Sequence, residues 1–593
     1  MLQRHRELGD NVDDSMNSSF RRSLLVLFLL MGTSSLVASH GSLPSLYSFL
    51  VFSRKPMQQL TKYIVLSYIS SDSLLYDSTA YTKCKGKPER ALYNGGILKD
   101  IEITSASNDS SPSFMLLNLT QGTKYSFSSW VKIDGVDSAL IRASLTTENE
   151  ELSCIGNVVA RSGCWSFLKG GFTLSSSPST STLSFQGPGN RDISIAVASV
   201  SLQPFTDEQW SRNQQRIISK VRKRPITIHV SDGNGERLQG VDLRVEQISK
   251  EFPFGSAIAK SILGNIPYQK WFVERFNTVV FENELKWSTT EPEQGKINYT
   301  IADQMLKFVR ESGVMVRGHN IFWENPNFVP AWVKNLTGSN LEKAVNARIT
   351  SLMDRYKEEF VHWDVNNEML HFDFFEQRLG PNASLDFFKV AHESDPLATL
   401  FMNEFNVVET CDDNNSSVDG YISRLRELKR GGVSMDGIGL QGHFSTPNLP
   451  LMRAVIDKLA TLGLPIWLTE VDISDKFDME TQAVYLEQVL REGFSHPSVN
   501  GIMMWTAIRL GRCFRMCLTD TEYQNLPAGD VVDKLLREWT TKDREGRTDK
   551  FGSYSFFGFL GEYLVTLKHG NRTVKSTFAL SHGIETMHVT IHL

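Results

Sequence analysis

The chain has 593 residues and a mass of 66.9 kDa, with 62 Lys and Arg against 67 Asp and Glu. A single barrel domain takes about 250 residues, so a chain of this length must hold more than one domain. The net charge of −5, without a basic stripe in the sequence, excludes nucleic acid as an expected partner.

Residues 1–39 have the pattern of a secretory signal peptide. Two arginines precede the apolar run Leu24–Met31, and small residues follow at Val37–Ser39. The run is shorter than the about 20 residues that cross a bilayer, so we expect cleavage, secretion and no stable membrane partner. A type II signal anchor is the alternative. Residues 40–76 match no recognisable pattern and receive no assignment.

Residues 77–205 are rich in Ser, Thr and Gly. Lys124–Lys132 and Ser194–Val200 alternate polar and apolar residues, which is typical of strands that bury one face. Many short strands with turn signals predict an antiparallel β-sandwich. Residues 206–250 are predicted to be a connector that contains a basic helix at Gln214–Arg224.

Residues 251–540 contain short apolar segments that each end in polar residues, with amphipathic stretches such as Leu341–Glu359 between most of them. Near-continuous apolar strands indicate parallel β/α units, because only strands covered on both faces lose polar alternation. Eight such units predict an α/β fold, the (β/α)8 TIM barrel, whose chemistry lies at the C-terminal strand ends. The segments are Phe252–Ile258, Thr278–Trp287, Val314–Trp323, Phe360–Glu368, Thr399–Asn406, Met435–Phe444, Leu464–Asp472 and Val499–Ile508.

Within residues 541–593, the segment Phe556–Leu593 alternates apolar and polar residues around His569–Asn571. This pattern predicts a small C-terminal β extension built on a hairpin.

Two glutamates, Glu368 and Glu470, lie at the ends of the fourth and seventh predicted strands. A pair of carboxyl groups, one a proton donor and one a nucleophile or base, is the minimal machinery for cutting a glycosidic bond. The other strand ends carry polar, charged and aromatic side chains, of which Asn, Gln, Lys and His reach sugar hydroxyls and indole faces suit the C–H faces of pyranose rings. These residues are Glu282, Asn283, Lys286, Trp287, Arg317, His319, Asn320, Trp323, Asn403, Asn406, Gln441, His443 and Trp505.

Five ordered motifs in this region resemble the catalytic barrel of glycoside hydrolase family 10, the retaining endo-1,4-β-xylanases. The resemblance is closest to plant members, through Arg-Met-Cys-Leu-Thr-Asp (515–520) and Phe-Phe-Gly-Phe-Leu-Gly-Glu-Tyr (556–563). Residues 77–205 are similar to a carbohydrate-binding module of the family 22 type. The five motifs are Glu-Asn-Glu-Leu-Lys-Trp (282–287), Arg-Gly-His (317–319) with Trp323, Trp-Asp-Val-x-Asn-Glu (363–368), Ile-Gly-Leu-Gln-Gly-His (438–443) and Leu-Thr-Glu-Val-Asp (468–472).

The resemblance implies a role for each matching residue. Glu368 would be the general acid and then the base, and Glu470 the nucleophile, supported by His443 and Asp472. Asn367 would contact the sugar 2-hydroxyl at the cleaved bond. The implied protein acts on cell-wall xylan and xylo-oligosaccharides as a monomer, with no metal or organic cofactor. The remaining implied substrate contacts are Glu282, Asn283, Lys286, His319, Trp323, Gln441 and Trp505.

Three positions depart from the family pattern. Glu324–Pro326 follow Trp323 where members often have a Gln, Cys513 stands where many microbial members have a second Trp, and Asn366 replaces an apolar residue. Two alternative functions stay open: xylan transglycosylation with the same carboxylates, and xylan binding without turnover. If the sandwich tethers the enzyme, its removal should affect insoluble xylan more than soluble oligomers.

A secreted chain is expected to carry glycans and disulfides. The six cysteines, at 84, 154, 164, 411, 513 and 517, allow 15 pairings, of which we favour Cys154 with Cys164 and Cys513 with Cys517. Asn-x-Ser/Thr triplets begin at Asn108, Asn118, Asn298, Asn335, Asn382, Asn414, Asn415 and Asn571.

Overall fold

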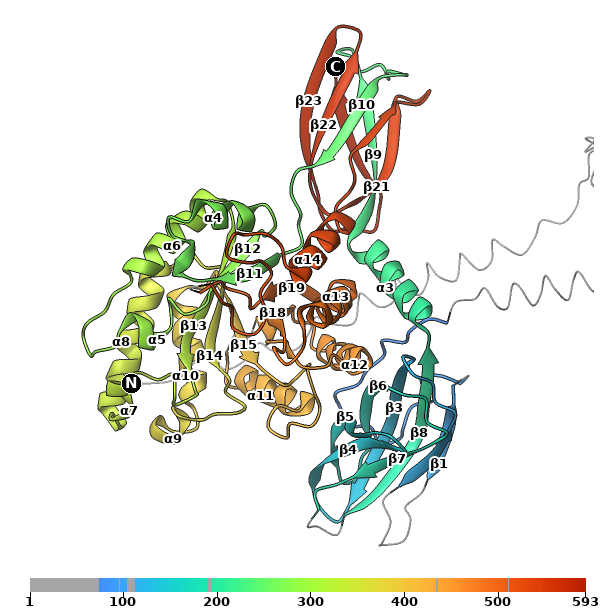
Figure 1. Cartoon of the computed structure of the whole chain (residues 1–593), viewed down its shortest axis with the longest axis vertical. Helices are drawn as coiled ribbons and strands as arrows, with labels where there is room; N and C mark the ends of the chain where they lie inside the picture. Colours follow the sequence, from blue (N-terminus) through green and yellow to red (C-terminus); the bar gives the residue numbers. More distant parts are fainter. Residues whose placement is uncertain (1–73, 95, 104–111, 190–192, 434–435, 510) are drawn as a thin grey trace, which may run out of the picture. The chain divides into compact units, whose positions relative to one another are not determined.

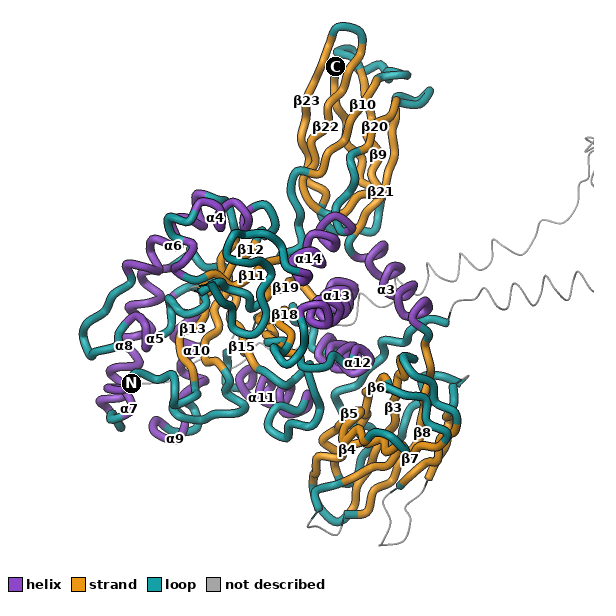
Figure 2. Tube along the Cα trace, viewed as in Figure 1, coloured by secondary structure: helices purple, strands orange, loops and turns teal. Residues whose placement is uncertain are grey.

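The computed structural model describes residues 74–593 except 95, 104–111, 190–192, 434–435 and 510 (Figure 1). The predicted signal peptide, most of the unassigned segment 40–76 and the triplet at Asn108 lie outside the described residues. Among the helices that the structure describes, none is long and apolar enough to cross a membrane. Figure 2 shows a strand-rich part at each end of the described chain and mixed helices and strands in between.

The first domain is an antiparallel β-sandwich, as predicted. Its two sheets have the strand orders β1-β8-β3-β6 and β2-β7-β4-β5, and Phe127, Ile141 and Phe185 are among the side chains buried in its core. The strands are β1 (Leu98–Ile103), β2 (Ser113–Leu117), β3 (Lys124–Asp134), β4 (Ser138–Thr147), β5 (Glu151–Arg161), β6 (Ser166–Thr173), β7 (Thr180–Gln186) and β8 (Ser194–Phe205).

A helix, α3 (Asp207–Val221), follows the sandwich. It begins with a capping box, in which Thr206 accepts a hydrogen bond from the backbone of Gln209 and the Gln209 side chain bonds back to Thr206. The segments predicted as connector and C-terminal extension then build one small β domain together, in sheets ordered β20-β10-β22-β23 and β21-β9-β24. A hairpin turn at Gly570, where φ is +58°, joins β22 and β23. The strands are β9 (Lys223–Ser231), β10 (Asp242–Gln247), β20 (Arg544–Arg547), β21 (Ser553–Phe559), β22 (Gly561–His569), β23 (Arg572–Leu580) and β24 (Met587–His592).

The central domain is a closed eight-stranded parallel barrel, as predicted. The strands follow each other in chain order from β11 to β16, then β18 and β19, and the β11–β19 pairing closes the ring. They are β11 (Phe254–Ile258), β12 (Thr278–Phe281), β13 (Met315–Trp323), β14 (His362–Asn367), β15 (Thr399–Glu404), β16 (Gly437–Leu440), β18 (Ile466–Ile473) and β19 (Val499–Met504), with the two-residue β17 (His443–Phe444) beside β18.

Helices alternate with the barrel strands along the chain. In α8, the residues predicted on one face, from Leu341 to Tyr356, are buried. The helices are η1 (Lys260–Ile262), α4 (Ile266–Val273), α5 (Trp287–Thr290), α6 (Thr300–Glu311), α7 (Ala331–Lys334), α8 (Gly338–Tyr356), α9 (Glu376–Leu379), α10 (Ala383–Ser394), α11 (Val418–Arg430), α12 (Leu449–Ala460), α13 (Met479–Ser495) and α14 (Pro527–Glu538).

The disulfides are Cys84–Cys164, Cys154–Cys411 and Cys513–Cys517. The predicted Cys513–Cys517 bond is confirmed, but the predicted Cys154–Cys164 bond is wrong. Reciprocal backbone hydrogen bonds between Lys85 and Trp165 place Cys84 next to Cys164. Cys154, on β5, instead faces the loop that follows barrel strand β15.

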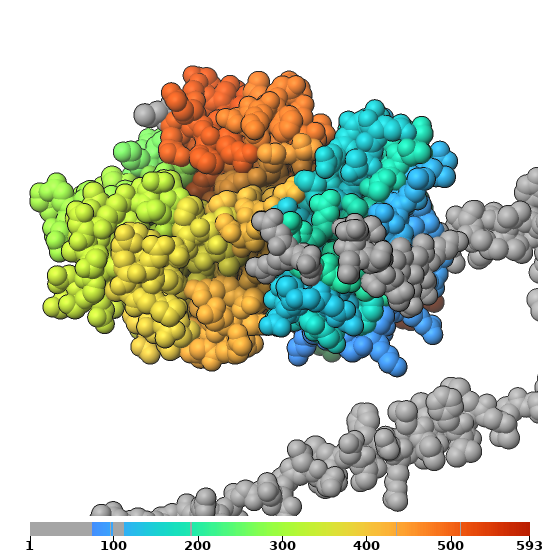
Figure 3. Space-filling model, turned by 90° about the horizontal axis from the view of Figure 1, so that it is seen from below, coloured from blue at the N-terminus to red at the C-terminus, as the bar shows by residue number. Residues whose placement is uncertain are grey.

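The sandwich and the barrel share a buried interface. Strands β3 and β6 pack on α12, and β5 packs on α11. In the space-filling view, the blue to cyan atoms of the sandwich lie against the yellow to orange atoms of the barrel (Figure 3). Lys169 of β6 and Asp457 of α12 form a fully buried ion pair of 2.7 Å. Tyr76 donates a hydrogen bond of 2.7 Å to Asp457 as well, and His496 of the barrel lies 3.1 Å from it. Separation of the two domains would break this buried ion pair, so the pair stabilises their association.

Candidate active site

Glu368 directly follows β14, and Glu470 lies in the C-terminal half of β18, so both are at the edge of the barrel where the sequence predicts the site. Glu368 has a φ of +61°, and its backbone N–H donates to the carbonyl of Asn403 over 3.0 Å. The N–H of Glu470 donates to the carbonyl of Gln441 over 2.7 Å. Their exposed fractions are 7% and 5%, so both carboxyl groups are almost removed from water.

Burial has the largest effect on the pKa of Glu368. It raises the pKa of this carboxyl to about 7, with a further contribution from the nearby carboxylates of Glu404 and Glu470. Trp323 Nε1 donates to Oε2 over 2.7 Å and Gln441 Nε2 donates to Oε1 over 3.1 Å. These two hydrogen bonds lower the pKa but do not cancel the effect of burial.

Glu470 has the opposite protonation preference. Burial would raise its pKa, but a hydrogen bond from His443 and the positive charges of His319, His443 and Lys286 together lower it to about 2. His443 Nε2 lies 3.4 Å from Glu470 Oε2, and Asn403 Nδ2 donates to Oε1 over 2.8 Å. This carboxylate is therefore ionised across the physiological pH range.

Asp472 contacts the ring nitrogen of His443 that points away from Glu470. Its Oδ1 lies 3.0 Å from His443 Nδ1. Burial lowers the pKa of His443, but the charges of Asp472 and Glu470 outweigh it and raise the pKa to about 10. Arg515 donates to Asp472 over 3.1 Å and to the carbonyl of Phe444 over 3.3 Å. Sequence reasoning missed Arg515 as a site residue because it lies in the loop after β19, away from any strand end.

The Asn403 side chain connects the two strands that carry the glutamates. Its Nδ2 donates both to Asn367 Oδ1, over 2.9 Å, and to Glu470. Its Oδ1 accepts from Thr469 Oγ1 over 2.5 Å. The amide is thus fixed in orientation, and it fixes Asn367 in turn.

A basic and aromatic group lies beside the glutamates. Lys286 Nζ donates to Asn283 Oδ1 over 2.9 Å and lies 4.7 Å from the ring centre of Trp323 and 5.8 Å from that of Trp505. The ring of His319 is 5.2 Å from Trp505. Burial raises the pKa of Glu282 to about 7 against the opposing charges of Arg509 and Lys286.

Four other predicted strand-end residues have different partners. Arg317 is buried in an ion pair of 2.7 Å with Asp364. Trp287 packs on Phe322 and donates to Glu291. Asn320 is buried at 1% exposure, and Asn406 donates to Asp413 in the loop after β15.

Two of the positions that depart from the family pattern contact each other. Asn366 Nδ2 donates to Glu324 Oε1 over 2.5 Å, and the backbone N–H of Phe375 donates to Glu324 Oε2 over 2.9 Å. Burial, together with the neighbouring Glu376, raises the pKa of Glu324 well above its usual range. The two unusual side chains are therefore hydrogen-bonded to each other in a buried position beside Ser384 and Phe375. The third position, Cys513, is in the disulfide with Cys517.

Comparison with known proteins identifies the family of the chain. A family model described as glycosyl hydrolase family 10 matches residues 244–509, and one described as a carbohydrate binding domain matches residues 99–192. The chain is 37% identical over 534 residues to endo-1,4-beta-xylanase 5-like of Arabidopsis thaliana, covering 86% of this chain and 90% of that protein. It is 36% identical over 493 residues to endo-1,4-beta-xylanase 5 of the same plant, covering 80% and 85%. The solved structure of xylanase 10B from Thermotoga petrophila in complex with xylobiose is 25% identical, with a TM-score of 0.43 over 49% of this chain and 94% of that chain.

Proposed function

Since this chain belongs to glycosyl hydrolase family 10, we propose that it hydrolyses internal β-1,4-xylosidic bonds of cell-wall xylan with retention at the anomeric carbon. The opposite pKa shifts of the two buried glutamates carry this proposal. With a pKa of about 7 Glu368 holds a proton near neutral pH, whereas Glu470, at about 2, is ionised. One protonated and one ionised carboxyl group are what a double displacement requires.

In the first step, Glu470 attacks the anomeric carbon while Glu368 protonates the glycosidic oxygen. A C–O bond forms to Glu470, the glycosidic C–O bond breaks, and the leaving xylan departs as an alcohol. Direct attack requires the carboxyl groups to be about 5–5.5 Å apart, so that no water fits between them.

In the second step, the now ionised Glu368 takes a proton from water, and the water oxygen attacks the anomeric carbon. The bond to Glu470 breaks, which restores both carboxyl groups to their starting states. Two inversions at one carbon give net retention. His443 and Asp472 keep Glu470 a competent nucleophile and leaving group, because they stabilise its ionised form.

The residues beside the glutamates suit a xylose chain. Asn367, held by Asn403, is assigned to the 2-hydroxyl at the cleaved bond, a contact that strengthens in the transition state. The ring faces of Trp323 and Trp505 are assigned to the C–H faces of the sugars. Asn283, Lys286, His319, Gln441 and Glu282 supply polar contacts to hydroxyls.

Labelling with a 2-fluoro xylobioside tests the nucleophile. We expect mass spectrometry of the digested protein to place the label on Glu470, and reduced xylohexaose to give shorter β-products. Glu470→Ala should lose the label and hydrolysis while keeping xylohexaose binding, and the exposed Glu480→Ala serves as the matched control. Turnover of Glu470→Ala within about tenfold of wild type would reject the assignment.

The same experiment separates the alternative functions. Products longer than xylohexaose would indicate transglycosylation, in which a xylan hydroxyl replaces water in the second step. Binding without label or products would indicate a xylan-binding protein.

Secretion as a monomeric glycoprotein completes the proposal. The seven Asn-x-Ser/Thr asparagines within the described residues are all exposed, as glycan acceptors must be. The three disulfides also fit an oxidising compartment. A drop in mass after enzymatic removal of N-glycans from plant-expressed protein would test this directly, and an unchanged mass would reject it.

A further inference from the structure

The loop of residues 405–417, which follows β15, connects the barrel strand ends to the sandwich. Cys411 is its central residue, with Glu409 two residues before it and Asp413 two residues after it. Glu409 contacts the backbone of Gly442 and His443, Asp413 contacts the ring of His371, and Cys411 is bonded to the sandwich.

Glu409 accepts hydrogen bonds from the backbone of Gly442 and His443. The side chains of Gln441 and His443, on either side of this glycine, contact the two glutamates. Glu409 Oε1 accepts from the N–H of Gly442 over 2.8 Å and from the N–H of His443 over 3.1 Å. Gly442 has a φ of +89°, and its carbonyl accepts from the N–H of Asp472 over 3.2 Å. The tight turn is therefore held on one side by β18 and on the other by the Glu409 carboxylate.

This turn determines where two site side chains lie. Gln441, on one side of Gly442, donates to Glu368, and His443, on the other side, lies next to Glu470. A shift of the turn by a fraction of an ångström would change both contacts at once, because the two side chains belong to the residues on either side of Gly442.

The same loop also supports the turn that follows Glu368. Asp413 Oδ2 lies 2.9 Å from His371 Nε2, and the opposite ring nitrogen of His371 lies 2.7 Å from Glu404 Oε1. The other oxygen of Glu404 accepts from the backbone N–H of Leu370 over 2.8 Å. Glu409 and Asp413 thus connect one loop to the surroundings of both glutamates.

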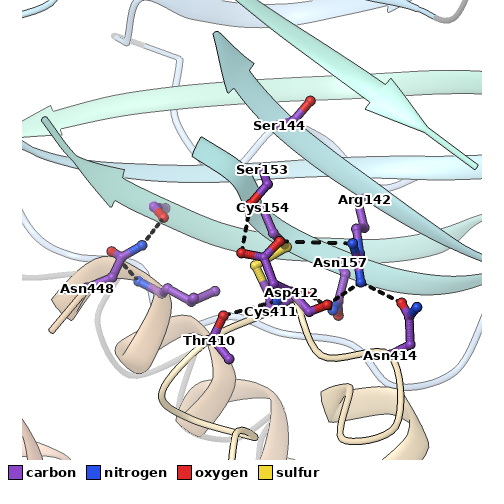
Figure 4. Close-up of a disulfide and its surroundings, with 12 residues drawn as sticks. Arg142, Ser144, Ser153, Cys154, Asn157, Thr410, Cys411, Asp412, Asn414 and Asn448 are labelled. Atoms are coloured by element: carbon purple, nitrogen blue, oxygen red, sulfur yellow. Dashed lines mark hydrogen bonds and ion pairs between the residues drawn. A yellow bond between two sulfur atoms is a disulfide. The ribbon is translucent and has the colours of Figure 1, made fainter. Parts of the chain in front are cut away.

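The sandwich holds the loop in place (Figure 4). Cys154 of β5 is disulfide-bonded to Cys411, and Asn157 Nδ2 donates to the Cys411 carbonyl over 2.9 Å. Ser153 donates to Asp412 over 2.7 Å, and Arg142 of β4 contacts both Asp412 and Asn414. All of these contacts fall within six residues of Glu409.

We propose that Glu409 is a positioning residue for the reaction, and that the sandwich fixes it in place through the Cys154–Cys411 bond. The sandwich is then a structural part of the active site in addition to any role in binding xylan. The proposal rests on the roles proposed for Glu368 and Glu470. Labelling of Glu470 in the wild-type protein tests those roles separately, so a failure there is distinguishable from a failure here.

The first test compares Glu409→Ala with Glu409→Gln in the full chain. Ala removes the acceptor for both N–H groups, so we expect kcat to fall roughly 10- to 100-fold with KM nearly unchanged. Gln keeps an oxygen that can accept both bonds, so it should stay within about threefold of wild type. The exposed Glu393→Gln of α10 is the control for charge. Active protein is counted by labelling to completion, which separates slow turnover from loss of folded enzyme.

The pH profile separates a shift of the turn from a general loss of stability, because a loss of stability alone would leave the profile unchanged. Glu470 faces His443, His319, Lys286 and Glu368. If the turn shifts and the His443 contact lengthens, the pKa of Glu470 rises, and the acidic limb of kcat/KM moves to higher pH. Amide hydrogen exchange in a peptide covering Gly442 and His443 should increase in Glu409→Ala and stay near wild type in Glu409→Gln. Wild-type kcat, pH profile and exchange in Glu409→Ala would overturn the positioning role.

The second test removes the cross-link. Cys154→Ser with Cys411→Ser should reproduce the lower kcat and the shifted acidic limb, whereas Cys84→Ser with Cys164→Ser, a bond at the sandwich alone, should keep both at wild-type values. If the first pair behaves like the second while Glu409→Ala is impaired, the sandwich does not fix Glu409, and that half of the proposal is wrong. If the first pair does not fold, Arg142→Ala and Asn157→Ala replace it, with the same expected and contradicting results.

Discussion

Trp323 donates its indole hydrogen bond to Glu368 Oε2 over 2.7 Å, and its ring stacks on Phe328 with centres 3.8 Å apart. Its ring is a proposed surface for a sugar, and its N–H directly influences the protonation of the proposed acid. The two roles can be separated, because the first concerns the ring and the second its N–H.

Trp323→Phe tests the influence on protonation. The indole hydrogen bond favours the ionised form of Glu368, so its loss should raise the pKa of that carboxyl above its value of about 7. Activity on the alkaline side is lost when the acid deprotonates, so the alkaline limb of kcat/KM should move to higher pH. Trp332→Phe, whose indole donates to the Glu291 carbonyl, is the matched control. A limb that moves to lower pH would contradict the assignment.

Asp472→Asn should act through His443. After burial, which lowers the pKa of His443, the charge of Asp472 is the largest effect on it and raises it, so the loss of Asp472 lowers that pKa. His443 then loses its positive charge in the alkaline part of the pH range and supports the Glu470 carboxylate less there. We expect kcat to fall about tenfold in the alkaline range and less in the acidic range, where His443 stays protonated. Activity measured from pH 3 to pH 9 checks this, and an equal loss at every pH would show that Asp472 acts on folding alone.

Much of the barrel could be predicted because its signals are local. Eight apolar runs with polar ends correspond to β11–β16, β18 and β19, and parallel strands necessarily bring their C-terminal ends to one edge. The roles of Glu368, Glu470 and the residues around them stay predictions, although the structure brings them together.

What could not be predicted depends on pairings between distant segments. Cys154 and Cys411 are 257 residues apart, so no local pattern in the sequence indicates that they pair. The pairing of β9 and β10 with strands near the C-terminus is equally distant in sequence. Strand ends also leave the direction of each side chain open, which is why Arg317 is buried against Asp364 while His443 faces Glu470.

The buried Lys169–Asp457 pair should contribute strongly to stability. Lys169→Met leaves the Asp457 carboxylate without its main cationic partner inside the protein, which costs about 3–5 kcal/mol when a buried pair is broken this way. Urea unfolding should show the loss as a lower midpoint. Lys307→Met removes an exposed ion pair with Glu311 and is the control, for which little change is expected. A midpoint for Lys169→Met equal to that of the control would mean that water reaches Asp457.

Removal of residues 1–205 should lower activity on soluble substrates as well as on insoluble xylan. Tethering alone predicts a loss on insoluble xylan, since a bound module raises the local concentration of substrate. The deletion also exposes the face of α12 that β3 and β6 cover, leaves Asp457 without Lys169, and frees the loop that holds Glu409. We therefore expect kcat on xylohexaose to fall about tenfold or more, with a lower unfolding temperature.

Removal of residues 1–73 alone is the matched control for this deletion, because it keeps every contact between the sandwich and the barrel. It should leave kcat on xylohexaose at the wild-type value. The ratio of activities on insoluble xylan and xylohexaose then isolates tethering, since the positional effect of the sandwich cancels in it. Full activity on xylohexaose after removal of residues 1–205 would show that the barrel keeps its active site without the sandwich.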